Sequence, residues 1–263
     1  MNVEYLIIIG IAVMFLLIIS FLLAFNMSQR RKFKYKQDIS ALKEQQQNEL
    51  IKAAVRSEEI ERHRISEELH DEVGAILSAT KLYLGNMHSE TLQKDDASLY
   101  TKSLELLDES IEKVRSISHN LHSAILKELG LNEAIKSFIQ KIGQSDNLKV
   151  TTELDEHYIS QNPDNDISIY RIIQELCNNI IKHGHATELN IRSKLQNGNL
   201  IFQIHHNGKG LSQEQFEKLR YESKGLGLKN IQNRIILLKG EINFTSQDNN
   251  HTIQLRVPLN NVA

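Results

Sequence analysis

The 263-residue sequence has little cysteine, proline or tryptophan: one cysteine, two prolines and no tryptophan. The single cysteine, Cys177, cannot form an internal disulfide, which is typical of proteins in a reducing compartment. Both prolines, Pro163 and Pro258, lie in the second half, so no proline interrupts a helix in the first half. Excess positive charge is also absent. The net charge of −2 at pH 7 excludes nucleic acid as the primary ligand and predicts no direct nucleic-acid partner.

The rest of the composition is that of a globular protein. Charged residues make up 24% of the chain and hydrophobic residues 40%, which excludes a disordered or collagen-like protein. The length allows one or two domains.

Charge is missing from one long segment, Tyr5–Phe25. At 1.5 Å per residue this run spans about 31 Å, the thickness of a bilayer core, and it predicts a transmembrane helix. Five of the seven residues in Arg30–Lys36 are Lys or Arg. The positive-inside rule then places this cluster against membrane lipid on the cytoplasmic side, with the N-terminus outside. A cleaved signal peptide is the alternative, but the basic flank follows the apolar run and no A-x-A-like site follows it.

A short extracytoplasmic tail, residues 1–4, and a cytoplasmic helical linker, residues 26–60, flank the expected span. The tail is too short to be a sensor domain. The linker is rich in Glu, Gln, Lys and Ala, which are good helix formers.

Two amphipathic helices follow the linker. Ile65, Leu69, Val73 and Ile76 fall on one helical stripe, and a second stripe runs from about Ala97 to Leu121, after a polar break at residues 88–96. A hairpin of two such helices leaves apolar surface uncovered, and pairing two copies as a four-helix bundle would bury it. We therefore predict a homodimer built on an all-α domain at residues 61–125.

The second half has a different residue pattern. Seven of the twelve glycines lie from Gly184 onward, and short β-like runs alternate with helical ones. A connecting segment, residues 126–145, has the pattern of a turn followed by a helix. Strands are expected at Lys149–Leu154, Glu188–Leu195, Leu200–His205, Glu241–Thr245 and Thr252–Val257, and helices at Asp166–Lys182 and Leu228–Leu238. This mixture predicts one α+β domain at residues 146–260.

His70 and Asp71 stand side by side in the segment ERHRISEELHDEVGAILSATKL, which begins at Glu61. On the helical wheel His70 lies just past the edge of the apolar stripe, so its ring can reach solvent. A neighbouring carboxylate can accept a proton from one ring nitrogen and leave the other electron-rich for attack on a phosphoryl group. Taken alone, such a pair is more often an ordinary surface pair.

The segment YRIIQELCNNIIKHGHA contains Glu175, Asn179 and Lys182 at helical spacing. Carboxylate and amide oxygens four residues apart can hold water and Mg²⁺, which prefers oxygen donors and substrate phosphates. Cys177, within the apolar face of this helix, is expected to pack in the core. Alone the motif is weak evidence, because polar helix faces are usually just solvated.

Two glycine motifs follow. In HHNGKG, Gly208 and Gly210 let backbone approach a flat ligand closely. In SKGLGLKNIQNR, Gly225 and Gly227 open a helix whose N-terminal amides could receive phosphates. Each pair by itself is more often a turn than a nucleotide site.

Together, the four segments resemble the sensor histidine kinases of two-component systems. ERHRISEELHD is similar to the dimerisation and phosphoacceptor box of the NarL/DesK-like subfamily, whose members partner with LuxR-type DNA-binding response regulators. The three later segments resemble the N box and the two glycine boxes of the histidine kinase ATPase domain. The resemblance covers Glu61 to about Pro258. It implies an ATP- and Mg²⁺-dependent protein histidine kinase in a bacterial inner membrane.

The resemblance also implies a Bergerat-type ATP-binding sandwich and roles for individual residues. His70 would be autophosphorylated with Asp71 as general base, and the phosphoryl group would pass to an Asp of a cognate response regulator. Glu175 would be catalytic, and Asn179 would bind the metal. The residues implied at the nucleotide are Glu175, Asn179, Lys182, His183, His206, Gly208, Gly210, Gly225, Gly227, Leu228 and Thr252. Residues 211–224 would form a short lid.

Three positions depart from the family pattern. His206 stands where the first glycine box has Asp, the residue that accepts a hydrogen bond from the adenine amino group. A neutral imidazole can also accept that bond, but a protonated one cannot. His251 replaces a glycine. Ala75 replaces the Gln that orients the hydrolytic water in members with strong phosphatase activity, so the resemblance does not carry phosphatase activity over to this chain, whereas it leaves kinase activity unaffected.

Two other classes of protein share some of these features. A membrane-tethered pseudokinase or dimeric scaffold is motivated by His206 and His251. An ATPase of the chaperone or DNA-repair type would lack a phosphohistidine, and the apolar span and the His70 segment argue against it. Clusters among the eleven histidines lack the Cys or carboxylate complement of a zinc site, so no structural metal is expected.

Overall fold

The computed structural model describes residues 3–85, 94–121, 124–144, 147–219, 226–247 and 250–259. At residues 3–9, 12, 13, 94–96, 226 and 247 it describes the backbone alone. The chain divides into two compact units, Met1–Ile51 and Lys52–Ala263.

The first unit is helical. Helix α1, Val3–Glu68, fills its described part and continues into the second unit, which agrees with the helical linker expected at residues 26–60. Among the residues that the structure describes, no helix has an apolar stretch long enough to cross a membrane. The transmembrane helix expected at Tyr5–Phe25 is therefore unconfirmed and stays a prediction.

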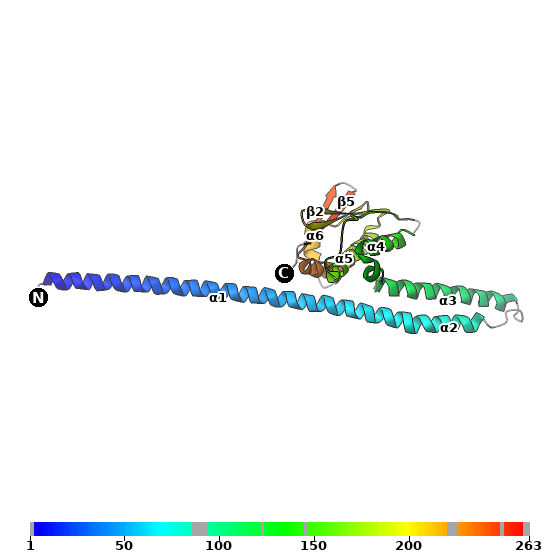
Figure 1. The fold of residues 1–263 in the computed structure, drawn as a ribbon, viewed down its shortest axis with the longest axis horizontal. Helices are drawn as coiled ribbons and strands as arrows, with labels where there is room; N and C mark the ends of the chain where they lie inside the picture. Colours follow the sequence, from blue (N-terminus) through cyan, green and yellow to red (C-terminus); the bar gives the residue numbers. More distant parts are fainter. Residues whose placement is uncertain are drawn as a thin grey trace. The chain divides into compact units, whose positions relative to one another are not determined.

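A helical hairpin opens the second unit. The end of α1 passes through one π-helical turn, η1 (Leu69–Val73), into α2 (Gly74–Gly85), and α3 (Lys94–Leu121) packs alongside (Figure 1). The buried hydroxyls of Ser66 and Ser118 each donate to the other residue's carbonyl oxygen, at 3.0 and 3.1 Å. This reciprocal pair fixes the register of the two helices. The polar break at residues 88–96 lies mostly outside the described residues.

Apolar side chains remain uncovered on this hairpin. Ile76 is 65% exposed, Leu99 68% and Leu106 53%. The single stripe expected for the first helix is thus only half covered within one chain, because Ile65 and Leu69 are partly buried while Val73 and Ile76 face outward.

The connecting segment forms α4, Ala124–Ile142, which is two helices joined at Gly130. Gly130 has φ of 81°, a left-handed conformation that favours glycine. The expected helix is present after this turn, whereas the residues before Gly130 are helical, which was not expected.

A five-stranded sheet follows, with order β1-β2-β3-β5-β4. The strands are β1 (Lys149–Glu153), β2 (Glu188–Gln196), β3 (Asn199–His206), β4 (Glu241–Gln247) and β5 (Asn250–Pro258). β1 is parallel to β2, and the other pairs are antiparallel. All five expected strands are present, with ends within two residues of the expected positions.

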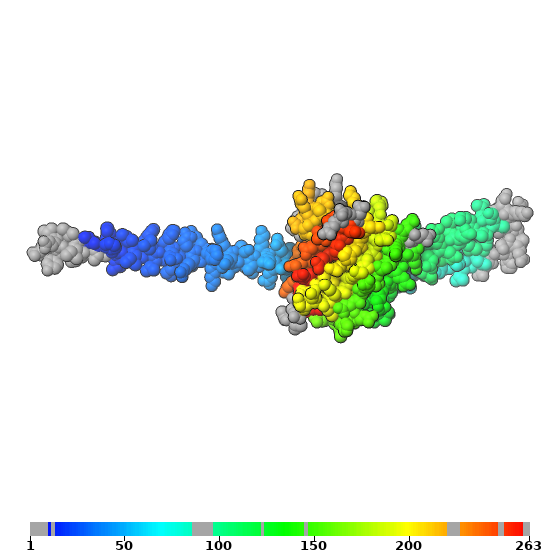
Figure 2. All heavy atoms as spheres, turned by 90° about the horizontal axis from the view of Figure 1, so that it is seen from above, coloured from blue at the N-terminus to red at the C-terminus, as the bar shows by residue number. Residues whose placement is uncertain are grey.

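Helices cover one face of this sheet (Figure 1). They are α5 (Pro163–Asn179) with the π-turn η3 (Ile180–Gly184), α6 (Gln213–Leu219), α7 (Leu226–Leu237) and the end of α4. Ile172, Phe202 and Leu255 are fully buried in the core between the two layers. Figure 2 shows the opposite face of the sheet, on which the strands lie side by side without a covering helix. The α+β sandwich is confirmed, whereas α6 was not expected.

Candidate functional site

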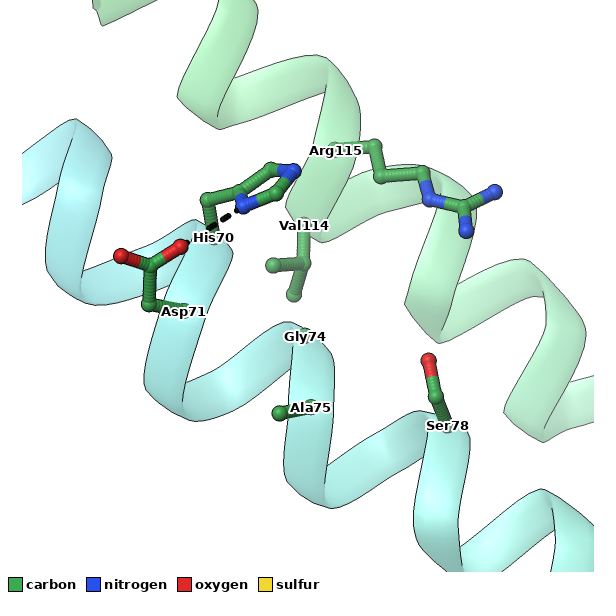
Figure 3. Close-up of a pocket in the computed structure, with 7 residues that line it drawn as sticks. All are labelled: His70, Asp71, Gly74, Ala75, Ser78, Val114 and Arg115. Atoms are coloured by element: carbon green, nitrogen blue, oxygen red, sulfur yellow. Dashed lines mark hydrogen bonds and ion pairs between the residues drawn. The ribbon is translucent and has the colours of Figure 1, made fainter.

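His70 and Asp71 form an exposed pair on the first helix of the hairpin. Nδ1 of His70 lies 2.9 Å from Oδ1 of Asp71, and the two side chains are 68% and 76% exposed (Figure 3). A carboxylate at Nδ1 favours the tautomer in which Nδ1 carries the proton. The lone pair of Nε2 is therefore free and accessible, as a nucleophile requires.

A π-helical turn presents this pair. His70 and Asp71 lie in η1, where hydrogen bonds reach one residue further than in an α-helix. Such turns are frequent at functional sites, and this one interrupts the α-helical spacing on which the sequence prediction relied. The apolar pattern carries no signal for it.

A shallow pocket lies beside His70. Residues of η1 and α2 form one side, and Val114 and Arg115 of α3 form the other (Figure 3). Sequence reasoning missed Arg115, because only the packing of α3 against η1 and α2 brings it to the histidine.

The second candidate region begins on α5. Asn162 caps this helix by accepting a hydrogen bond from the backbone nitrogen of Asp164, and Pro163 occupies its first turn. One face of α5 carries Glu175 and Asn179, whose Nδ2 donates to Oε1 of Glu175 at 3.4 Å. The two oxygen donors expected near the metal are thus brought together.

Lys182 and His183 lie beyond the end of α5. Both belong to the wider turn η3 and are exposed. Because this turn departs from regular α-helical spacing, Lys182 does not continue the helix face that carries Glu175 and Asn179. Cys177 is buried in the core as expected, and burial raises the pKa of its thiol to about 12.

The glycine motifs are closely packed against protein atoms. A Cβ at Gly227 would lie 2.0 Å from Oε1 of Glu175, and one at Gly210 would lie 1.9 Å from Nδ1 of His251. A Cβ at Gly208 would lie 2.5 Å from the carbonyl oxygen of Gly184. Leu228 packs against the core, and Gly225 lies outside the described residues, as does residue 220 onward of the expected lid.

We expect Gly227→Ala to weaken nucleotide binding, because the new methyl group displaces the Glu175 carboxylate. The stabilisation of the full chain by Mg²⁺ and ATP in a thermal shift assay should fall by at least half. Gly85→Ala is the matched control, since no atom lies within 4 Å of a Cβ at that position. Equal thermal shifts in the two variants would contradict this role of Gly227.

His206 and His251 are paired across β3 and β5. Their rings stack with centroids 5.2 Å apart, and Nδ1 of each is buried without a hydrogen-bond partner among the described residues. Burial, followed by the charges of His251 and His205, lowers the pKa of His206 to about 4. His206 is therefore neutral at pH 7 and can accept a hydrogen bond.

Thr252 lies on the other face of the sheet. Its hydroxyl is 2.8 Å from Nδ1 of His205, and strand alternation places His251 on the face of His206 instead. The structure thus brings His251, not Thr252, next to His206. The two-residue period of the expected strand was the signal that could have identified His251.

The lowered pKa of His206 predicts a pH-dependent stability. An unfolded histidine takes up a proton near pH 6.5, whereas folded His206 does so only near pH 4. The contribution is complete above about pH 6.5 and is lost progressively as the pH falls toward 4. We expect the melting temperature to drop over this range, and less steeply in His206→Gln. If the melting temperatures of wild type and His206→Gln fell equally with pH, the lowered pKa of His206 would be contradicted.

These features define a class of protein: a helical hairpin with an exposed, carboxylate-paired histidine, joined to an α+β domain with a carboxylate–amide face and glycine motifs. Residues 61–126 match the family model described as histidine kinase. Residues 164–261 match the family of histidine kinase-, DNA gyrase B- and HSP90-like ATPases, which supports the use of ATP.

Two curated relatives are sensor kinases. The chain is 28% identical over 217 residues to the oxygen sensor histidine kinase NreB of Staphylococcus carnosus. This match covers 81% of this chain and 60% of that protein. It is 24% identical over 211 residues to the sensor histidine kinase MctS of Rhizobium johnstonii. This match covers 80% of this chain and 45% of that protein. The chain thus spans about half the length of these relatives.

A solved structure, the histidine kinase AdeS of Acinetobacter baumannii, covers 74% of this chain and 98% of its own at 20% identity and a TM-score of 0.42. From the two family models and the curated relatives, the chain belongs to the sensor histidine kinases.

Proposed function

We propose that this chain is a membrane-anchored, homodimeric kinase that phosphorylates His70 from ATP and passes the group to an Asp of a LuxR/NarL-type response regulator. The observation that carries the proposal is the 2.9 Å contact between Nδ1 of the exposed His70 and Asp71. It supplies an oriented nucleophile in the same chain as an ATPase domain.

The reaction follows from this geometry. The Nε2 lone pair of His70 attacks the γ-phosphorus of ATP, an N–P bond forms, and the bond from phosphorus to the bridging oxygen breaks to release ADP. The ring gains positive charge during the attack. Asp71 takes the Nδ1 proton and leaves a neutral phosphorylated imidazole. The regulator's carboxylate then attacks the same phosphorus. Nδ1 takes up a proton as the N–P bond breaks, so His70 leaves as a neutral imidazole.

The donors on α5 fit a nucleotide–metal complex. Asn179 and Glu175 offer oxygen atoms on one face, and Mg²⁺ prefers such donors together with phosphate oxygens and water. When bound, the metal would neutralise phosphate charge. Lys182 and His183 are exposed in η3, the turn that follows, and would bind the phosphates from there. Neutral His206 would accept a hydrogen bond from the adenine amino group.

Dimerisation and membrane anchoring are supported by uncovered apolar residues. Ile76, Leu99 and Leu106 are more than half exposed on the hairpin, and a second hairpin would bury them. Within the uncharged run, Leu16 and Phe21 are each 69% exposed, as suits contact with lipid. The basic cluster after the run favours a single pass through a bacterial inner membrane, with the N-terminus outside.

Phosphotransfer tests the proposal. The full chain, labelled with [γ-³²P]ATP and Mg²⁺ and freed of nucleotide, is mixed with the receiver domain of a regulator that has a LuxR-type output domain. The label should move to the receiver, and it should stay on the kinase when the acceptor Asp is replaced by Asn. An absence of label on the kinase would refute the proposal.

A pseudokinase scaffold is the second candidate. His206 and His251 favour it, because Nδ1 of each is buried and has no hydrogen-bond partner among the described residues. His206 stands where the family reads adenine with a carboxylate, and His251 stands where it has a glycine. A scaffold would show no thermal shift with Mg²⁺ and ATP, whereas the kinase would be stabilised.

A further inference from the structure

The pocket beside His70 is open on the side of the free ring nitrogen. Asp71 holds Nδ1, so Nε2 is the atom that can carry a phosphoryl group. In Figure 3 this nitrogen is turned away from Asp71 and toward α3, the helix that carries Val114 and Arg115.

The wall of the pocket next to the ring has almost no side-chain bulk. Gly74 and Ala75 occupy the turn after His70, and both line the pocket. A tetrahedral group on Nε2 therefore has room here without displacing a large side chain.

The charges around His70 on its own helix are negative. Glu67, Glu68, Asp71 and Glu72 lie within three residues of it. A phosphoryl group brings nearly two further negative charges at pH 7 and would be repelled by these carboxylates. Of the seven residues that line the pocket, Arg115 alone carries a permanent positive charge.

Arg115 is available for this task. Its guanidinium pairs with Glu112 at 3.1 Å, one turn away on α3, and the two side chains are 58% and 73% exposed. Exposed ion pairs of this kind contribute little to stability, so the guanidinium can exchange partners at low cost. Its planar fork matches two oxygens of a phosphoryl group, which an ammonium group cannot do.

We propose that Arg115 binds the phosphoryl group of phosphorylated His70, exchanging Glu112 for two phosphoryl oxygens. This inference rests on the proposed phosphorylation of His70. No bond to Arg115 forms or breaks: the arginine stabilises the N–P product after ADP has left, and it slows return of the group to ADP or to water.

Three variants of the full chain test the assignment. Arg115→Gln removes the charge, Arg115→Lys keeps the charge but not the fork, and Lys113→Gln removes a neighbouring charge of α3 that does not line the pocket. At a fixed ratio of ATP to ADP, we measure the phosphorylated fraction of His70. After nucleotide removal, we measure the lifetime of the phosphohistidine.

In Arg115→Gln, both the ratio of phosphorylated to free His70 and the lifetime should fall about tenfold, as expected for the loss of a charge-assisted hydrogen-bonded pair. Arg115→Lys should lie between Gln and wild type, and Lys113→Gln should match wild type. The melting temperature and the KM for ATP should not change, because the nucleotide binds another domain.

Wild-type values in Arg115→Gln would overturn the inference and leave the kinase proposal intact. An equal loss in Lys113→Gln would also overturn it, since the effect would then be one of general charge. If Arg115→Gln melts early, the test passes to Arg115→Lys, and wild-type lifetime there overturns the bidentate contact. A wild-type chain without label on His70 would instead defeat the proposed function itself.

Discussion

Replacing His70 with Gln should reduce phosphate incorporation from [γ-³²P]ATP to background. An exposed helix face tolerates a side chain of the size of Gln, but Gln has no nucleophilic ring nitrogen. Because the His70 side chain is 68% exposed, the variant should fold with a melting temperature close to that of wild type. Labelling of the full chain, measured on acid-free gels, checks the result.

His63→Gln is the matched control. His63 lies on the same helix, two turns before His70, and is 50% exposed. It should label as well as wild type does. Label retained in His70→Gln, or lost equally in both variants, would contradict the role of His70.

Replacing Glu59 with Gln should destabilise the second unit by about 3 kcal/mol, the lower end for breaking a buried ion pair. Glu59 accepts hydrogen bonds from Arg171 of α5 at 3.1 Å and from Arg234 of α7 at 2.8 Å. The two arginine side chains are only 7% and 3% exposed, so little water can solvate their charges once the carboxylate is removed. Arg234 keeps its ion pair with Glu58 at 3.0 Å, so the larger part of the loss falls on Arg171. Arg171 also donates to the carbonyl oxygen of Asn120 at the end of α3.

Urea denaturation of wild type and Glu59→Gln checks this expectation. The control is Glu153→Gln, which breaks the pair with Arg192 on the exposed sheet face, where the side chains are 62% and 53% exposed. That loss should stay below about 1 kcal/mol. Equal losses in the two variants would show that the buried arginines do not depend on Glu59.

The sheet and the helical layer could be predicted from the sequence because their signals are local. A run of apolar residues, Leu200–Phe202, marks β3. The helical pattern that was expected from Asp166 marks α5, although its true start at Pro163 was not predicted. The approach of Glu175 to Asn179 was also predictable, since an α-helix places residues four apart on one face.

The remaining features depend on contacts that the sequence does not encode locally. The π-turns η1 and η3 turn the side chains of His70 and Lys182 away from the directions that an α-helix would give them. No residue type predicts such a turn. Arg171 meets Glu59 across 112 positions of sequence. Arg115 reaches the pocket of His70 only because α3 packs against η1 and α2. Each contact arises from tertiary packing.

The most direct test of the account is the chemistry and the position of the phosphate. The purified chain is incubated with Mg²⁺ and ATP, digested at alkaline pH and analysed by mass spectrometry. We predict one phosphopeptide that carries the group on His70, that survives alkali and that loses the group in mild acid. A phosphate that is stable in acid, or one that maps to another residue, would contradict the account.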